Sequence, residues 1–392
     1  MRLRVLSLAA ASAALLGALA SAPTAWSATQ AKPFPAWAAP TIDKSLTTDQ
    51  ASSIVAERTK PQTDWLGPTS GEQAPKGVKH IIYVSADQSY VSFVNWGRGV
   101  VEAAKILGWQ VDILNGRGAV TSTLQAMQQA VAVHPDAIIT SADASALQGP
   151  IAQAVAAGIP VVGIHAAAFP GPDPELNLYD NITSNPAEIG ETQAAYVLAE
   201  SKGTAQVVHF LDNSFAIARF KAEAATTPIQ NCAGCKFLGM QNIPIADQTQ
   251  RIPTVISGLL ANDGHHWWGT TCCDNFYPYV AAALRASNIA PTDIKLVGSD
   301  GPPSAYDLIR KGDYEVATVP EPSTLFGFQA IDAVIQAMAG KEPSHFIQPT
   351  YLVTKANADQ EGGKKDEFIP SNHFACHYQN IWLGETKDCS GS

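Results

Sequence analysis

The sequence predicts an α/β fold built on two parallel β-sheets, and three observations support that prediction. Residues 80–114 contain two β-branched runs separated by a run with helical spacing, which is the pattern of a βαβ unit. The same alternation of short apolar runs and helical segments recurs along the chain. The 392 residues exceed one compact core, since a domain holds about 150 residues. Two lobes, each with its own sheet, are therefore expected.

Residues 1–28 are predicted to be a secretory signal peptide. Arg2 and Arg4 precede an apolar stretch at residues 5–20, and small residues follow it. The stretch is too short and wrongly flanked for a transmembrane helix, and no cysteine stands beside it to carry a lipid anchor. The mature protein is therefore expected to be exported.

Residues 29–77 are expected to form an extended N-terminal arm. Their composition is rich in Pro, Thr and Ser, and it offers a single short helix at 48–58 after an N-cap signal at Thr47. We expect the arm to pack on the core through Trp37 and Trp65, and nothing in it suggests chemistry.

From residue 78 onward, Gly or Pro ends most of the helical segments and separates them from the apolar runs. Strands are expected at residues 81–84, 111–114, 137–140, 161–164, 207–211, 237–241, 267–271, 295–298 and 316–319. Helices are expected at residues 121–133, 147–157, 188–201, 253–260, 279–286, 303–311 and 325–338, before a last extended segment at 350–354. Strands separated by helices pair in parallel, so about five strands should form each sheet.

The charge balance excludes one class of partner. The formal net charge is −10 at pH 7, and the basic residues form no cluster. A nucleic-acid partner is not expected, because binding requires a basic face that releases counterions from phosphate.

Six cysteines in an exported protein favour disulfides. They fall into three local pairs, Cys232 with Cys235, Cys272 with Cys273, and Cys376 with Cys389. A bridge is expected to close the first pair, because Ala233 and Gly234 can turn tightly. The adjacent Cys272 and Cys273 leave two alternatives open, a strained vicinal disulfide or thiols that are free or paired elsewhere. The third pair is expected to pin residues 376–392 as a surface tail.

An enzyme is not expected, and neither a cofactor nor a metal is implied. No nucleophile with a base, no paired acid and base, and no phosphate-binding glycine loop is recognisable. His265 and His266 would point to opposite faces of a strand, and no third zinc ligand is suitably spaced. Gly97 and Gly99 fall within a helix, where we expect them to serve packing.

A series of short motifs resembles one known family. Its marks are the first strand with its polar corner, Pro135-Asp136-Ala137-Ile138-Ile139, residues 156–162, Asp180-Asn181, Val297-Gly298-Ser299-Asp300-Gly301, and Ala317-Thr318-Val319. Their order and spacing resemble the type I periplasmic binding proteins, in the ribose- and galactose-binding branch that serves ABC importers. This core is shared with LacI-type repressors, but those carry a DNA-binding module and no leader.

The resemblance implies two Rossmann-like lobes with parallel sheets, joined by a hinge of three chain crossings. The first lobe would comprise residues 78–183 and 322–342. The second lobe would comprise residues 184–321 and 343–375. In that family the ligand is trapped between the lobes when they close.

The resemblance also implies ligand-binding positions in the first lobe. They are Asp87, Gln88, Tyr90 and Phe93 at the first corner, Ser141 and Asp143 after the third strand, and His165 after the fourth. An aromatic ring would cover the apolar face of a sugar, while carboxylates and amides would bond its hydroxyls. His165 stands where relatives often have an Asp-Arg pair.

Matching positions in the second lobe are Asn213, Arg219, Cys273, Asp274, Asp300 and Glu321. Arg219 would donate two parallel hydrogen bonds to the ligand. Asp300 would point into the cleft because Gly298 and Gly301 let the backbone turn. Cys273 and Asp274 replace an Asn-Asp pair of the family.

The resemblance implies an exported solute-binding protein that delivers its ligand to the permease of an ABC importer. The expected ligand is a monosaccharide or polyol, and the expected state is a monomer. Two alternatives stay open, namely an exported ligand sensor for a signalling receptor and a receptor for a small aromatic or other non-sugar metabolite.

Overall fold

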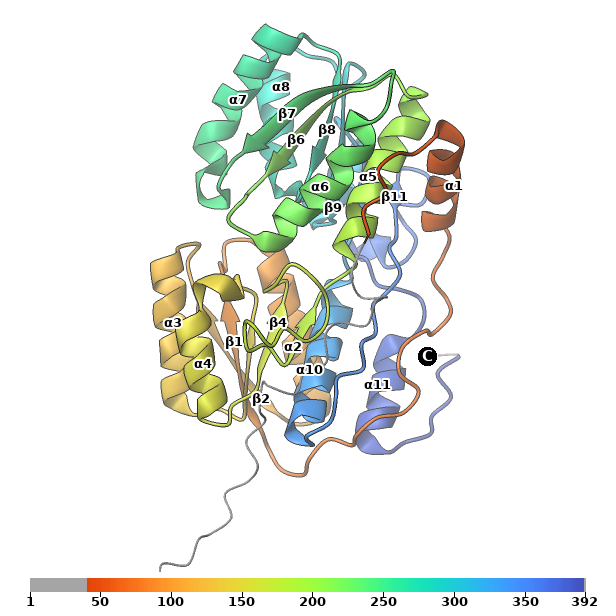
Figure 1. Ribbon diagram of the computed structural model, residues 1–392. Helices are drawn as coiled ribbons and strands as arrows, with labels where there is room; N and C mark the ends of the chain where they lie inside the picture. The colour runs from red at the N-terminus through yellow and green to blue at the C-terminus, as the bar shows by residue number, and fades with distance from the viewer. Residues whose placement is uncertain (1–40, 391–392) are drawn as a thin grey trace, which may run out of the picture.

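A computed structural model describes residues 41–390, which form two α/β lobes one above the other (Figure 1). The first lobe is built on a five-stranded parallel sheet with the order β2-β1-β3-β4-β5. Its strands are β1 (His80–Ser85), β2 (Gln110–Asn115), β3 (Ala137–Thr140), β4 (Val161–Ile164) and β5 (Asp180–Ile182). Four helices contact this sheet or its flanking helices, namely α2 (Val91–Ile106), α3 (Val120–Val133), α4 (Gln148–Ala156) and α10 (Ser323–Met338).

The second lobe has a six-stranded sheet with the order β11-β10-β9-β8-β6-β7. Its strands are β6 (Gln206–Leu211), β7 (Lys236–Asn242), β8 (Trp267–Thr271), β9 (Ile294–Asp300), β10 (Glu315–Pro320) and the antiparallel β11 (Val353–Thr354). Its helices are α5 (Pro186–Ser201), α6 (Ala216–Gln230), α7 (Gln248–Asp263), α8 (Tyr277–Ala286) and α9 (Pro303–Lys311). The two-sheet α/β fold expected from the sequence is confirmed.

Both sheets place their first strand between the second and the third. With this order, the loops after the first and the third strand of a sheet run to opposite sides of it. A crevice forms between these loops at the carboxyl ends of the strands, and this is where open α/β sheets bind ligands. The chain passes between the sheets three times, after β5, after β10 and after α10. The polar corners after β1, β3, β6 and β8 therefore lie near the passages that connect the lobes.

All nine strands expected from the sequence are present, and two more are added. The additional strand β5 has only three residues, too few for a recognisable alternation. The last extended segment contributes only Val353 and Thr354 as an antiparallel edge. Helix α7 begins at Gln248, five residues before the expected start at Pro253, which lies inside the helix.

Helices α2 and α10 cross at unusually close range over one face of the first sheet (Figure 1). A Cβ atom added at Gly327 would lie 2.0 Å from the carbonyl carbon of Gly99. A Cβ atom added at Gly99 would lie 2.9 Å from the carbonyl oxygen of Ser323. Gly99 therefore serves helix packing, as expected, and Gly327 is its counterpart.

The N-terminal arm contacts both lobes. Helix α1 (Thr48–Arg58) packs on α5 of the second lobe, and the Leu352 N–H donates a 2.8 Å hydrogen bond to the Arg58 carbonyl. Trp65 then stacks on His377, with ring centroids 4.9 Å apart. The expected helix and the contact of Trp65 are present, whereas Trp37 and the predicted signal peptide lie outside the described residues.

The C-terminal segment is more than a surface tail, which corrects the expectation for residues 376–392. It contains helix α11 (Phe374–Leu383), whose Phe374, Tyr378 and Trp382 are buried and form a ring cluster with Phe328 of α10. Their spacing of four residues defines one helix face. The Trp382 indole also donates a 2.9 Å hydrogen bond to Asp332, so this segment belongs to the packing of the first lobe.

Within residues 41–390, none of the helices is both long enough and apolar enough to cross a membrane.

We expect Gly327→Ala to destabilise the protein, because the added methyl group would overlap the α2 backbone. Overpacking of this kind costs about 1–3 kcal/mol or more. The matched control is Gly258→Ala in α7, where a Cβ atom would have no neighbour within 4 Å. That change should stabilise by about 0.5–1 kcal/mol through helix propensity. Urea unfolding of both variants measures the difference, and equal effects would contradict the close packing of α2 and α10.

Candidate functional site

A small pocket lies between the lobes, where strand ends of both sheets meet. Its volume is about 40 Å³. The first lobe contributes Tyr90, Phe93, Trp96, Ser141 and His165, and the second contributes Asp212, Phe215, Ile217, Ala218, Lys221, Ile245, Cys272, Cys273 and Asp300. Half of these fourteen side chains are aromatic or aliphatic, and the arrangement of the polar groups decides the chemistry of the site.

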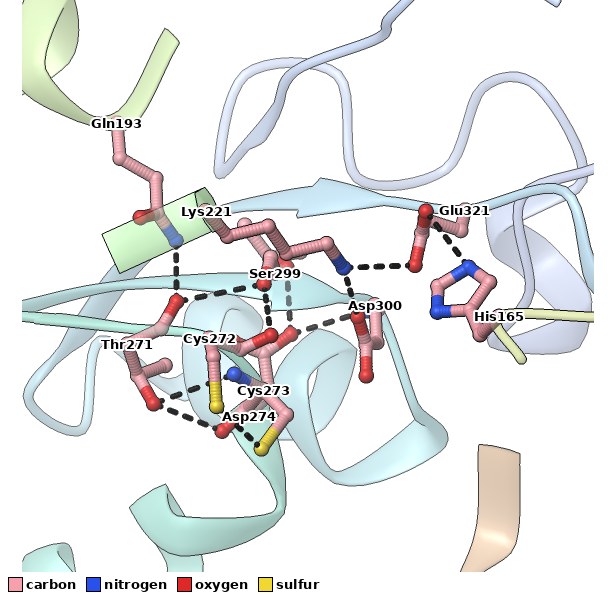
Figure 2. Close-up of polar contacts among 12 residues, drawn as sticks. His165, Gln193, Lys221, Thr271, Cys272, Cys273, Asp274, Ser299, Asp300 and Glu321 are labelled. Atoms are coloured by element: carbon pink, nitrogen blue, oxygen red, sulfur yellow. Dashed lines mark hydrogen bonds and ion pairs between the residues drawn. The ribbon is translucent and has the colours of Figure 1, made fainter. Parts of the chain in front are cut away.

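The polar end of the pocket is an ion cluster centred on Lys221 (Figure 2). The Lys221 Nζ lies 3.0 Å from Asp300 Oδ1 and 3.0 Å from Glu321 Oε2. The Lys221 side chain is only 3% exposed. Asp300 is the last residue of β9, Lys221 is on α6, and Glu321 lies in the second crossing between the lobes. The cluster therefore ties the pocket to the hinge.

The charges of this cluster compensate one another. Burial alone would lower the pKa of Lys221, but Asp300 and Glu321 hold it above its ordinary value. Burial also opposes ionisation of Glu321, yet His165 and Lys221 hold its pKa below the ordinary range. Burial and the neighbouring Glu321 raise the pKa of Asp300, although Lys221 acts in the opposite direction. Lys221 and Glu321 thus form the ion pair, and Asp300 is the group that can keep a proton.

His165 contributes from the first lobe. Its Nε2 lies 3.1 Å from Glu321 Oε1, but the two atoms are not aligned as a hydrogen bond, and neither has another hydrogen-bonding partner. Burial lowers the pKa of His165, and the neighbouring Glu321 acts in the opposite direction. The imidazole lies 4.4 Å from the Trp96 ring. His165 Nε2 can therefore bond an oxygen atom of a ligand in the pocket.

The backbone at the polar end is held in special conformations. Asp300 has φ of 81° and Gly301 has φ of 66°, both in the left-handed region. The Gly301 N–H donates a 3.0 Å hydrogen bond to Asp274 Oδ2. A positive φ is uncommon for a residue with a side chain. This turn directs the Asp300 carboxylate toward Lys221 (Figure 2).

The structure brings most of the expected ligand-binding residues to this place. Those at the pocket wall are Tyr90, Phe93, Ser141, His165, Cys273 and Asp300, while Glu321 lies behind the wall and bonds Lys221. Three important side chains were not anticipated, namely Trp96, Phe215 and Lys221. Lys221 could have been suspected, because it follows Ile217 and Ala218 at helical spacing within an otherwise apolar stripe.

Arg219 does not reach the pocket, which corrects one expectation. It is exposed, and its Nη1 donates a 2.6 Å hydrogen bond to the carbonyl of Asn213, which is also exposed. Two residues along a helix are separated by about 200° around its axis. Arg219 therefore faces solvent when Lys221 faces the cleft.

Asp274 lies in the core of the second lobe rather than in the pocket, which is a second correction. Its Oδ2 accepts hydrogen bonds from Gly301 N–H at 3.0 Å and Thr318 Oγ1 at 2.6 Å. A Cβ atom added at Gly298 would lie 1.2 Å from Asp274 Oδ1 and 2.9 Å from Glu315 Oε1. Gly298 is thus needed to make room for two buried carboxyl groups, not for a turn.

Burial raises the pKa of Asp274 to about 7, against the opposing hydrogen bond from Thr318. Burial and the nearby Asp274 raise the pKa of Glu315 well above its ordinary value. Glu315 is fully buried and its oxygens have no other hydrogen-bonding partner among the described residues. The pair is therefore stable only while it retains a proton.

Cys272 and Cys273 are both thiols, so of the two alternatives that the sequence left open the vicinal disulfide is not formed. Their sulfur atoms are 3.2 Å apart (Figure 2). The Ser299 hydroxyl donates to the Cys272 carbonyl at 2.6 Å, and the Thr271 hydroxyl donates to the Cys273 carbonyl at 3.0 Å. These bonds fix the backbone of the two cysteines. Their thiols form a weakly polar, polarisable part of the pocket wall. The other two pairs, Cys232–Cys235 and Cys376–Cys389, are disulfide-bonded.

Asp143 joins the two lobes directly. Its Oδ2 accepts a 2.9 Å hydrogen bond from the backbone N–H of Ala216, the first residue of α6. Residue Phe215 at the N-cap of α6 supplies no side-chain cap, so Asp143 caps this helix from the opposite lobe. Asp143 thus stabilises the contact between the lobes instead of lining the small pocket.

Two residues of the corner after β1, Asp87 and Gln88, lie outside the small pocket in different environments. Asp87 accepts a 2.8 Å hydrogen bond from the Ser89 N–H and lines a second cavity instead of the small pocket. Gln88 lines neither cavity, and its N–H donates to Asn115 at 3.0 Å. Within the described part of the chain, no group of three or more His, Cys, Asp and Glu side chains is placed to hold a metal ion.

Comparison with known proteins supports the relationship suggested by the motifs. A family model described as periplasmic binding protein domain matches residues 81–342. The ribose import binding protein RbsB of Bacillus subtilis is 26% identical over 279 residues, which cover 67% of this chain and 83% of the relative. The match to the family model leaves out the N-terminal arm and the C-terminal segment.

Two solved structures have the same fold. An ABC transporter solute-binding protein of Agrobacterium vitis, bound with α-D-tagatopyranose, has a TM-score of 0.66 at 16% identity and matches 74% of this chain and 99% of its own. A Caulobacter myo-inositol binding protein, bound to myo-inositol, has a TM-score of 0.64 at 18% identity and matches 74% of this chain and 98% of its own.

We expect Asp143→Ala to shift the protein toward an open arrangement of the lobes. The change removes a helix cap that exists only when the lobes touch, which is worth about 1 kcal/mol, or roughly fivefold in the open-to-closed ratio. Small-angle X-ray scattering should record a larger radius of gyration. Gln148→Ala is the control, since Gln148 is an exposed residue of the neighbouring α4 and the change leaves Asp143 and its bonds intact. Identical scattering curves for wild type and Asp143→Ala would contradict a capping role across the cleft.

We expect the free energy of unfolding to fall as pH rises from about 4 through about 7, partly because of the buried carboxyl pair. The unfolded chain releases these protons near pH 4, whereas the folded chain retains them, so stability decreases over this range. Glu315→Gln removes one ionisable group and should flatten the decline. Urea unfolding at several pH values checks this. Glu175→Gln at an exposed position is the control, and an unchanged slope in Glu315→Gln would refute the pairing.

Proposed function

Because this chain belongs to the periplasmic binding protein family, we propose that it captures a monosaccharide or polyol between its lobes and delivers it to an ABC importer. Its homologues are sugar and polyol solute-binding proteins of ABC transporters. The observation that carries the proposal for this chain is the pocket itself, whose wall combines side chains of both lobes.

The pocket suits a neutral hydroxylated ligand. Asp300 can accept a hydrogen bond from a hydroxyl group and, when protonated, can also donate one. His165 lines the same space, and its Nε2 lies 3.1 Å from Glu321 Oε1 at the edge of the ion cluster. Trp96 and Phe93 supply rings that can cover the apolar face of a ring or chain. The positive charge of Lys221 is compensated by two carboxylates, so no unpaired positive charge invites a phosphate.

Closure of the lobes would couple ligand binding to recognition of the protein by the importer. A ligand favours the closed state only through contacts that it makes better there than in the open state. Tyr90, Trp96 and His165 approach from one lobe, whereas Asp300 and Cys273 approach from the other. Glu321 is located in a crossing and contacts groups of both lobes, so movement at that crossing would disturb the pocket.

The same proposal assigns the location and the partner. The predicted leader would export the chain to the periplasm, where the closed form would dock as a monomer on the permease of the importer. Release of the ligand there needs lobe opening and no bond to be broken, so we assign no catalytic step to the pocket.

We expect a sugar or polyol to raise the melting temperature in a thermal-shift screen of ligand-stripped protein. A ligand at about 100 times its Kd adds about 2.7 kcal/mol of stability. Asp300→Asn should weaken binding of the best compound by about tenfold or more in calorimetry, because a hydrogen bond to a charged group contributes about 1.5–3 kcal/mol.

The matched control is Asp307→Asn, at an exposed position that pairs with Lys311. It should bind like the wild type. Melting shifts confined to small aromatic acids would overturn the sugar-or-polyol assignment and would point to the aromatic wall instead. Unchanged affinity in Asp300→Asn would overturn the assignment of the polar end.

A further inference from the structure

A second cavity adjoins the small pocket and opens between the same two lobes. Its volume is about 290 Å³. The two cavities share a wall formed by Phe93, Asp212, Phe215 and Ile245. We call the small pocket the inner pocket and this second cavity the outer chamber.

The inner pocket is too small for a complete monosaccharide while the lobes are in contact. A water molecule needs roughly 10–15 Å³ on this scale, so about 40 Å³ accommodates roughly three water-sized groups. That is the size of one hydroxylated end of a sugar or polyol. The remainder of any larger ligand must extend past the shared wall, and the outer chamber is the adjoining space.

The outer chamber is walled mainly by apolar groups. From the first lobe these include Ala119, Val120, Ala142 and Leu147, and from the second Pro244, Ile245 and Ala246. Val120 is 59% exposed, so part of this apolar wall is open to water. An apolar substituent placed here would remove Val120 and its neighbours from water.

The ionisable groups of the chamber exclude anions. Its described lining contains three carboxylates, Asp87, Asp143 and Asp212, and no Lys, Arg or His side chain. Asp143 accepts from the Ala216 N–H, and Asp212 accepts from the Ile245 N–H at 2.9 Å. These carboxylates are satisfied by the backbone and do not call for a hydroxyl-rich partner. The substituent should therefore be uncharged or cationic.

The shared wall can rearrange. The rings of Phe93 and Phe215 lie 6.2 Å apart and come from different lobes. Phe215 is only partly buried and precedes the first turn of α6 in an extended conformation. A change of its rotamer would join the two cavities without moving the helix.

We propose that the ligand spans both cavities, as a hydroxylated compound that carries an aryl or alkyl substituent. This inference rests on the proposed function, because it places the sugar or polyol end at Lys221 and Asp300. The outer chamber holds the apolar substituent between Val120 and Ile245, and Phe93 and Phe215 lie against the bond that links the two parts.

The test compares parent compounds with their phenyl derivatives by isothermal titration calorimetry. The probes are ribose against phenyl riboside, and glycerol against its monophenyl ether. Burial of a phenyl group stabilises by about 1.5–3 kcal/mol, so at least one derivative should bind tenfold to about a hundredfold more tightly than its parent.

Two variants fill the outer chamber from opposite lobes. Ala146→Trp and Ala246→Trp start from exposed positions that line the chamber, so neither change disturbs a core. Each should remove the gain from the phenyl group and leave the affinity of the parent within about twofold. Ala282→Trp on α8 is the control, since Ala282 is exposed and lines neither cavity.

The outcomes separate the two hypotheses. If parent and derivative bind equally and both Trp variants leave them unchanged, the two-part ligand is overturned while the sugar-or-polyol function stands. If the Trp variants weaken parent and derivative alike, the chamber has no separate role and the inference is also overturned. If none of the four compounds binds, the inference falls together with the proposed function for these ligand classes.

Discussion

The ion cluster around Lys221 is the constraint on which the rest of the site depends. A lysine whose side chain is 3% exposed is tolerated only when its charge is compensated, and here two carboxylates lie 3.0 Å away. Removing one partner from a buried cluster costs about 3–5 kcal/mol, because the other charge is left without compensation. Since Glu321 belongs to a crossing and Lys221 to α6, the cluster fixes the second lobe relative to the hinge.

The same cluster determines what kind of ligand the pocket can accept. The charge of Lys221 is compensated by internal partners, so neutral hydrogen-bonding groups of a solute suit the pocket better than a second charge. Aromatic rings and two thiols make up much of the remaining wall. Recognition of a ligand must therefore combine a few directed hydrogen bonds with contacts to apolar side chains. The polar contacts lie in the inner pocket, and the apolar contacts continue into the outer chamber.

The lobes are held together by contacts that lie outside the matched family region as well as within it. Asp143 caps α6 across the cleft, while the arm packs on α5 and then on α11. In addition, Arg310 of the second lobe bonds Asp359 and Asp366, and Arg98 of the first lobe bonds Glu367. The C-terminal segment thus bridges both lobes, so any opening movement must accommodate these additional links.

The sequence by itself determined the alternation of strands and helices, because local periodicity and Gly or Pro at helix ends act over short distances. Its motifs also resembled those of a known family, and that resemblance is why Tyr90, His165 and Asp300 were recognised. Only the tertiary structure decided which face of α6 meets the cleft, and that choice placed Lys221 inside and Arg219 outside. It likewise buried Asp274 beside Glu315 and joined Asp143 to the opposite lobe, because helix orientation and contacts between lobes arise from packing between distant segments.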